Sequence, residues 1–154
     1  MIESVFIWLG KTPPGLFLAQ STAAFAATES VHIVALALVG GAILVADLSV
    51  LGVLLKTTSA LVVMRQLRVL YAAALVVVAA SGVLLVAAGP YKYFTNPLFP
   101  LKLSLLLAAL ILQWTLARRL RQRGKIDRKA RVLAATSLVL WSGVVIAGRW
   151  LGLI

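Results

Sequence analysis

The sequence predicts an all-α integral membrane protein: a four-helix bundle preceded by short interfacial N-terminal helices. Hydrophobic residues make up 62% of the 154 residues and charged residues only 12%, whereas an ordinary soluble domain is about 45–50% apolar and about 25% charged. Four segments are each long and apolar enough to cross a bilayer core, which takes about 20 helical residues. Ala and Leu dominate these segments, without the alternation of period two that membrane strands require.

The composition excludes several classes of protein and site. The chain has no cysteine, so it offers no disulfide framework, no thiolate nucleophile and no Cys-ligated zinc or iron–sulfur centre. Its net charge of +11 comes from basic residues that lie between long uncharged segments, not on a soluble fold, so we expect no nucleic-acid partner. We expect no enzyme activity, because no nucleophile–base arrangement, phosphate-binding loop or pair of catalytic carboxylates is visible.

We interpret residues 1–154 as a single membrane domain. Residues 1–28 are expected to form an interfacial N-terminal segment: a first helix from Glu3 to Leu9, a break at Pro13-Pro14, and a second helix that leads into the first span. The four spans are expected at about 30–55, 69–88, 101–117 and 132–153.

The distribution of basic residues predicts the orientation of the spans. Eleven of the 15 lysines and arginines lie in two connections, one between the first and second spans and one between the third and fourth. Because basic loops stay on the cytoplasmic side, we expect a multi-pass protein of the bacterial inner (plasma) membrane with both termini in the periplasm. Residues 57–68, in the first connection, are expected to form an amphipathic helix against the inner surface of the lipid bilayer.

The first span carries one polar face. Glu29 and Asp47 lie 18 residues apart, which is five turns of α-helix, so both project from the same side. His32 lies near that side, and Gly40-Gly41 form a notch there at which a neighbouring helix can approach closely. We expect this face to point into the bundle, where Glu29 would form a structural ion pair with Arg149, near the outer end of the last span.

Asp47 is expected near the inner surface, about 22 Å deeper than His32 at 1.5 Å per residue. A charge inside a membrane span is costly and usually has a partner. We therefore expect Asp47 to pair with Lys56, Arg65 or Arg68, or to cap a helix end.

His32 is the only histidine. An imidazole can ligate the iron of haem b or exchange a proton. One histidine cannot supply both axial ligands within one chain, and Met64 is expected on the opposite side of the membrane. We expect no cofactor, with haem b or another metal group at His32 as the alternative. In that alternative Arg149, Tyr91 and Tyr93 would surround the group near the outer surface.

Three groups of residues carry a resemblance. They are Glu29-Ser30-Val31-His32 with Asp47-Leu48 in the first span, Lys92-Tyr93 with Asn96-Pro97 in the outer loop, and Trp141-Ser142-Gly143 with Ala147-Gly148-Arg149-Trp150 in the last span. Together they resemble a family of small four-span bacterial inner-membrane proteins of unknown function, over most of residues 29–153. This resemblance implies the topology but no activity. The family usually has Asp-Leu-Arg where this chain has Asp47-Leu48-Ser49, so the neighbour that would pair with Asp47 on its own helix is missing. A looser likeness, at the level of fold, is to cytochrome b561 and copper-resistance membrane proteins.

The sequence leaves three functions open. Because it offers many small residues and few chemical groups, we expect a non-catalytic subunit or accessory component of a larger membrane assembly, such as an electron-transfer assembly. Small-residue faces would bind other membrane subunits or a second copy of the chain. The first alternative is a redox carrier that binds haem b or quinone at His32. The second is a transporter of a small solute or of protons along the Glu29–Asp47 face, for which the sequence shows few intramembrane polar groups.

Overall fold

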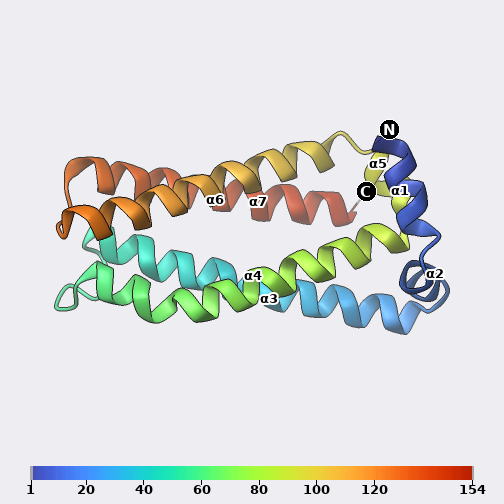
Figure 1. Ribbon diagram of the computed structural model, residues 1–154, viewed down its shortest axis with the longest axis horizontal. Helices are drawn as coiled ribbons and strands as arrows, with labels where there is room; N and C mark the ends of the chain where they lie inside the picture. Colours follow the sequence, from blue (N-terminus) through green and yellow to red (C-terminus); the bar gives the residue numbers. More distant parts are fainter. Residues whose placement is uncertain (1, 154) are drawn as a thin grey trace.

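The computed structural model describes the backbone of residues 2–153 and the side chains of residues 3–150. All regular structure in this part of the chain is α-helical (Figure 1). The four long helices are α3 (Thr22–Leu51), α4 (Ala60–Ala88), α6 (Leu98–Arg123) and α7 (Arg128–Leu153). The three short helices are α1 (Ile2–Gly10), α2 (Pro13–Gln20) and α5 (Pro90–Phe94).

The long helices form two antiparallel hairpins that lie lengthwise against each other (Figure 1). Helix α3 packs against α4 and α6 against α7, and the two hairpins meet mainly through α3 and α7. Helix α3 has 30 residues, α4 has 29 and α6 has 26, which exceeds the roughly 20 that a bilayer core requires. All four long helices are also apolar enough to cross a membrane. The predicted all-α membrane four-helix bundle is confirmed, and the protein is a multi-pass membrane protein.

Local sequence determines where the long helices begin and end. The Ser21 hydroxyl accepts a hydrogen bond of 3.2 Å from the N–H three residues later, which satisfies one free N–H in the first turn of α3. Gly52 and Gly124 end α3 and α6 with φ angles of 77° and 64°, where the absence of a Cβ avoids a steric clash. Asp127 caps α7 by accepting a hydrogen bond of 2.8 Å from the Ala130 N–H.

Several expected boundaries differ from those observed. Helix α3 covers Thr22–Leu51 and not about 30–55, because Gly52 ends it in a left-handed conformation, and α7 begins at Arg128 and not at about 132, because Asp127 caps it. Residues 57–68 do not form a separate surface helix, because the segment from Ala60 onward contains no helix breaker and continues as the first turns of α4. Helix α6 extends beyond 101–117 at both ends, since Arg and Gln favour helix almost as well as Leu does, and it stops only at Gly124. Helix α2 does not run into the first span, because Ser21 adopts an extended conformation between α2 and α3.

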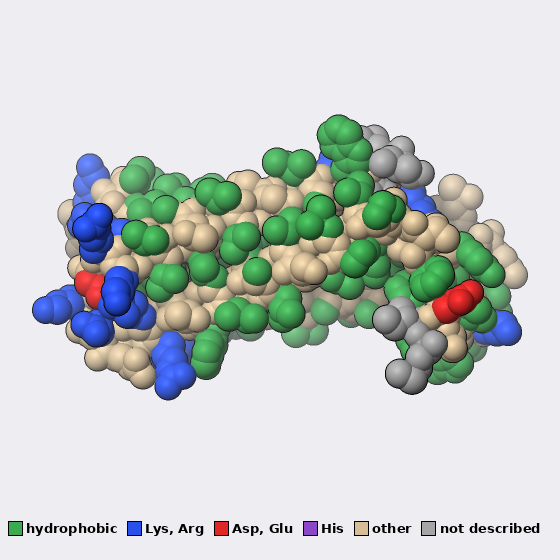
Figure 2. Space-filling view, turned by 90° about the horizontal axis from the view of Figure 1, so that it is seen from above, with side chains coloured by type: hydrophobic (Ala, Val, Ile, Leu, Met, Phe, Trp, Pro, Cys, Tyr) green, Lys and Arg blue, Asp and Glu red, His purple; other side chains and the backbone are tan. Residues whose placement is uncertain are grey.

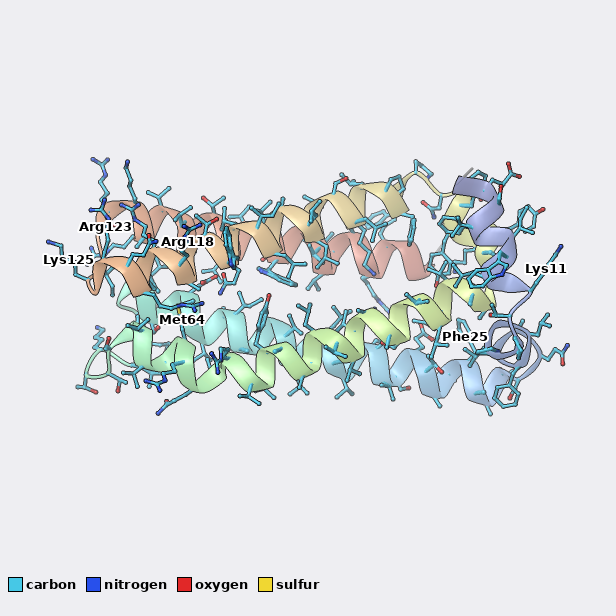
Figure 3. The ribbon with its side chains drawn as sticks, in the orientation of Figure 1. Lys11, Phe25, Met64, Arg118, Arg123 and Lys125 are labelled. Atoms are coloured by element: carbon cyan, nitrogen blue, oxygen red, sulfur yellow. The ribbon has the colours of Figure 1, made fainter. Side chains whose placement is uncertain are left out.

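The two ends of the bundle differ in charge. Most of the Lys and Arg side chains gather at the end where the α3–α4 loop (residues 52–59) and the α6–α7 connection (124–127) lie, which we call the basic end (Figure 2). Figure 3 places Met64, Arg118, Arg123 and Lys125 at this end, and Lys11 and Phe25 at the opposite end. The charge therefore follows the pattern that the sequence predicts, with both basic connections on one side.

The opposite end, which we call the capped end, is covered by α1, α2 and α5 (Figure 1). The Phe6 ring of α1 lies 5.8 Å from the Phe94 ring of α5 and 5.8 Å from the Phe99 ring of α6, measured between ring centroids. Helix α2 packs closely as well, since a Cβ on Gly15 would lie 2.8 Å from a carbonyl oxygen of α1 and 3.0 Å from one of α4. These contacts fix the short helices over the ends of the spans.

Small and β-branched side chains fill the interior. The central cluster comprises Ala35, Val39, Ile43, Ala74, Val78, Ala109, Trp141 and Val144. The basic-end cluster comprises Val50, Ala60, Leu116, Leu120, Ala130 and Ala134. Many larger apolar side chains instead face outward along the middle of the bundle (Figure 2). This distribution suits a lipid solvent, because close helix packing and not the removal of apolar surface from water holds membrane helices together.

Candidate functional site

Asp47 lies inside the bundle, one turn before the end of α3. Its side chain has 0% exposed surface, and among the described residues neither carboxylate oxygen makes an ion pair or a hydrogen bond of full geometry, although Ser137 and Gln113 lie next to it. The predicted pairing of Asp47 with Arg65 or Arg68 is therefore wrong. Both arginines project from the exposed side of α4, and the rotation of α4 about its axis, which sets that direction, is not visible in the sequence.

Three polar side chains from the other long helices lie around Asp47. The Ser137 hydroxyl of α7 donates a hydrogen bond of 3.0 Å to the Gln113 side-chain oxygen of α6, and both residues are buried. This pair faces the carboxylate, and Tyr71 of α4 is close enough to sense its charge. We call Asp47, Gln113 and Ser137 the Asp47 layer; with Tyr71, all four spans contribute to this region.

Apolar side chains close the Asp47 layer on both sides. One turn toward the capped end lies Ile43, which is 1% exposed and belongs to the central cluster. One turn toward the basic end lies Val50, which is 0% exposed and belongs to the basic-end cluster. Asp47 is thus separated from water at both ends of the bundle by close-packed apolar residues.

A second polar group lies in the capped half of the bundle. The His32 ring nitrogen Nδ1 lies 2.8 Å from the Ser81 Oγ, and the Ser81 hydroxyl lies 2.5 Å from the Val77 carbonyl oxygen. Serine has one proton, and the carbonyl can only accept, so Ser81 donates to Val77 and accepts from Nδ1–H of His32. In the neutral imidazole this network leaves Nε2 as the nitrogen with a free lone pair, able to take a proton or a ligand.

Lys102 of α6 lies beside His32. A Cβ on Gly148 would lie 3.2 Å from both Cε and Nζ of Lys102, so the lysine crosses α7 where that helix lacks a side chain. Its charge is close enough to act on the imidazole. Lys102 is half-buried in the bundle, and sequence reasoning did not place it beside His32. We call His32, Ser81 and Lys102 the His32 layer.

The other residues predicted around His32 are not gathered there. Glu29 and Arg149 are both exposed, and among the described residues they form no ion pair with each other. Tyr91 is 69% exposed. Tyr93 packs edge-on against Phe99, with ring centroids 5.5 Å apart; burial raises the pKa of its phenol, and the nearby Glu29 carboxylate raises it further.

His32 is isolated as a candidate metal ligand. Within the part of the chain that the structure describes, no three His, Asp or Glu side chains come together, and Met64 lies at the basic end (Figure 3). Among the described residues, His32 therefore does not belong to a cluster of three such side chains.

The predicted polar face of α3 is confirmed in part. Asp47 and Ile43 are buried, and His32 is half-buried against α4, but Glu29 is exposed. A Cβ on Gly40 or Gly41 would meet nothing within 4 Å. The glycine notch is therefore open and does not receive a neighbouring helix of the same chain.

The two layers are separated by the central cluster. Along α3 the 15 residues from His32 to Asp47 span about 22 Å. Trp141 lies between them, one turn from Ser137; it is 5% exposed and its indole N–H has no hydrogen-bond partner. Among the described residues, the interior therefore holds an indole N–H and a carboxylate without hydrogen bonds of full geometry.

A family model matches almost the whole chain. Residues 2–154 match a family model described as "Family of unknown function (DUF6644)". No curated protein and no solved structure matches the chain. Since the match covers almost every residue, the chain belongs to DUF6644, a family of unknown function.

Proposed function

We propose that this protein carries protons across the bacterial inner membrane and that Asp47 is the group that takes them up and releases them. The observation that supports the proposal is a carboxylate inside a membrane bundle that has no exposed surface and, among the described residues, no cationic partner, with only the neutral side chains of Gln113 and Ser137 beside it. A bare charge in hydrocarbon is costly, and ionisable residues buried in this way mark proton relays and ion pathways. Proton uptake removes the charge, and proton release restores it.

The close packing around Asp47 favours a proton over a larger solute. Ile43, Val50 and Leu116 in the two apolar clusters are each at most 1% exposed, so the interior leaves no room for an organic molecule. A proton needs only a short-lived chain of water molecules. The indole N–H of Trp141 and the polar side chains of the Asp47 layer would form hydrogen bonds with these water molecules.

Of the three functions that the sequence leaves open, the helix packing supports transport more than an accessory subunit or a redox carrier. From the sequence, transport was the weakest of the three because few polar groups were expected inside the membrane. Helix packing adds Lys102 and Ser81 to His32, and Gln113 and Ser137 to Asp47. In this proposal the His32 layer exchanges protons with the capped end, and Asp47 exchanges them with the basic end.

The orientation within the proposal follows from charge. The basic end lies in the cytoplasm, because basic connections remain on that side. The capped end and both termini then lie in the periplasm.

Proton flux into liposomes tests the proposal. Purified protein is reconstituted with a pH-sensitive dye inside the vesicles, and a potassium gradient with valinomycin supplies the driving force. We expect flux above that of empty vesicles for the natural protein and for Thr115→Ala, a control at an exposed residue that bonds only to its own helix. Asp47→Asn should reduce flux to the level of empty vesicles. Equal flux for Asp47→Asn and Thr115→Ala, with both variants folded by circular dichroism, would contradict the proposal.

A second candidate is the accessory subunit, and the open notch at Gly40-Gly41 favours it. Gly41 is exposed, and apart from its chain neighbours and the adjacent backbone of α3, no described atom lies within 4 Å of the place where its Cβ would be. A helix of another subunit or of a second copy could approach closely there. We expect the protein to migrate as an assembly in mild detergent and Gly41→Leu to dissociate it. A natural protein that is monomeric and co-purifies with nothing would contradict this function.

A further inference from the structure

A cavity of about 500 Å³ opens at the basic end. It lies between the α3–α4 loop and the α6–α7 connection, which are far apart in the sequence. Its polar lining comes from Ser49 near the end of α3, from Lys56, Thr57, Thr58 and Ser59 on the first loop, and from Lys125 on the second. This volume is in the range of small-molecule binding sites.

The cavity carries positive charge that the chain does not neutralise. Asp127 is the only acidic residue at the basic end, and it is engaged by Arg119 in the one ion pair found among the described residues. Lys56 and Lys125 are therefore without an acidic partner within that part of the chain. The two lysines and the three exposed hydroxyl groups of Thr57, Thr58 and Ser59 suit an anion with several acceptor oxygens, such as a phosphate group.

The surroundings of the cavity favour a phosphate that is attached to a lipid. Val53, Leu54 and Leu55 on the first loop are 59%, 40% and 49% exposed, and Ile126 on the second is 38% exposed. The mouth of the cavity therefore has apolar side chains beside its lysines. A phospholipid can contact both, because it has a charged headgroup and hydrocarbon chains.

The depth of the cavity also matches a lipid headgroup. Helices α3 and α6 end beside it and α4 begins there, so it lies where the spans leave the hydrocarbon. Exposed Trp114, whose ring centroid lies 5.4 Å from the Arg118 guanidinium, lies about 15 Å before Gly124 along α6, so it marks the hydrocarbon side of the interface and the cavity lies on the headgroup side. Tryptophan and arginine at a span end are typical of the membrane interface.

We propose that this cavity binds the phosphate headgroup of an anionic phospholipid, held by Lys56 from one hairpin and Lys125 from the other. Basic pockets between membrane helices on the side of positive loops bind such headgroups. The bound lipid connects two hairpins that meet only sparsely between α4 and α6. It stabilises the folded bundle because it binds the folded chain and not the separated hairpins.

Measurement of lipid binding to the purified protein in detergent tests the inference. Native mass spectrometry is performed with phosphatidylglycerol, with phosphatidylcholine and with inorganic phosphate, on the natural protein, on Lys56→Gln/Lys125→Gln and on the control Arg121→Gln/Lys129→Gln. The control removes two charges from exposed residues of the same end that do not line the cavity. We expect phosphatidylglycerol to bind in preference to phosphatidylcholine. Its affinity should fall about thirtyfold in the cavity variant, about 2 kcal/mol for two lysines, and less than about threefold in the control, whose residues lie outside the cavity.

Two results would overturn the inference. Equal losses in the cavity variant and the control would mean that lipid follows overall charge and not this cavity. Binding of inorganic phosphate as tight as that of phosphatidylglycerol would mean that the site holds a free anion. Circular dichroism and thermal unfolding of both double variants without added lipid establish that each remains folded.

Discussion

Ser81 accepts the hydrogen bond that His32 Nδ1 donates at 2.8 Å, because the single hydroxyl proton of Ser81 is donated to the carbonyl of Val77. This relationship fixes which nitrogen of the only imidazole is protonated in its neutral form, and it directs the chemically free nitrogen, Nε2, away from Ser81.

The first prediction concerns this tautomer. Since the chain has one histidine, nitrogen NMR of protein labelled with ¹⁵N-histidine gives a single pair of ring signals. We expect a protonated Nδ1 and an unprotonated Nε2 in the neutral state. Ser81→Ala removes the acceptor and should shift the population toward the Nε2–H tautomer. A natural protein that already carries its proton on Nε2 would show that the hydrogen-bond network is assigned wrongly.

The second prediction compares two helical glycines. Gly15 is buried, and a Cβ there would lie 2.8 Å from a backbone oxygen, so Gly15→Ala should lower the free energy of unfolding by about 1–3 kcal/mol through overpacking. Gly41 has open space around it, so Gly41→Ala should raise that free energy by up to about 1 kcal/mol through helix propensity. Thermal unfolding in detergent measures both. Equal stability of the two variants would mean that α2 is not packed as described.

The third prediction is a pH dependence at the basic end. The Arg119 guanidinium, followed by the Ala130 N–H, holds the pKa of Asp127 below its usual range. A carboxylate with a depressed folded-state pKa contributes stability that is full above its unfolded pKa, about 3.9, and is lost as the pH falls through the folded value. The Tm of the natural protein should therefore fall below about pH 4. Asp127→Asn keeps the helix cap, but its Tm should fall less over the same pH range. Parallel Tm curves for the two proteins from pH 7 to pH 3 would contradict a stabilising ion pair.

The fourth prediction is the orientation in the membrane. Because the chain lacks cysteine, single-cysteine variants can be labelled with an impermeant maleimide without background. Lys11 and Lys125 are exposed and lie at opposite ends (Figure 3). We expect Lys11→Cys to react from the periplasmic side of cells and Lys125→Cys only in inverted vesicles. The reverse pattern would place the basic end outside and contradict the positive-inside argument.

Most of the fold could be predicted from the sequence because the lipid bilayer that surrounds the spans determines it. A bilayer requires about 20 apolar helical residues for each span, and that pattern is local in the sequence. The helix ends were less exact: α3 and α6 stop at the left-handed glycines 52 and 124, whereas the spans were expected to end at about 55 and 117. The start of α4 was misplaced because Arg65 and Arg68 suggested a surface, whereas a helix continues past charged residues unless a breaker follows.

The interior of the site was harder to predict, because it depends on how each helix is rotated. The spacing of 18 residues predicted that Glu29 and Asp47 project from the same buried side of α3. Asp47 does lie on the buried side, but Glu29 is exposed. Helices in bundles repeat their buried face with a period nearer to 3.5 residues than 3.6, so over 18 residues the face drifts by about 50°. Lys102 was missed for another reason: its place depends on Gly148, 46 residues away on a different helix.

The most direct test of the account measures proton exchange at Asp47 by infrared difference spectroscopy while the pH is stepped. The chain has four acidic residues, so the carbonyl stretch of a protonated carboxylic acid can be assigned by substitution. We predict a carboxylic acid band whose amplitude changes with pH, which persists in Asp127→Asn and disappears in Asp47→Asn. A band that persists in Asp47→Asn, or an Asp47 signal that does not respond to pH, would contradict the central claim that this buried carboxylate takes up and releases a proton.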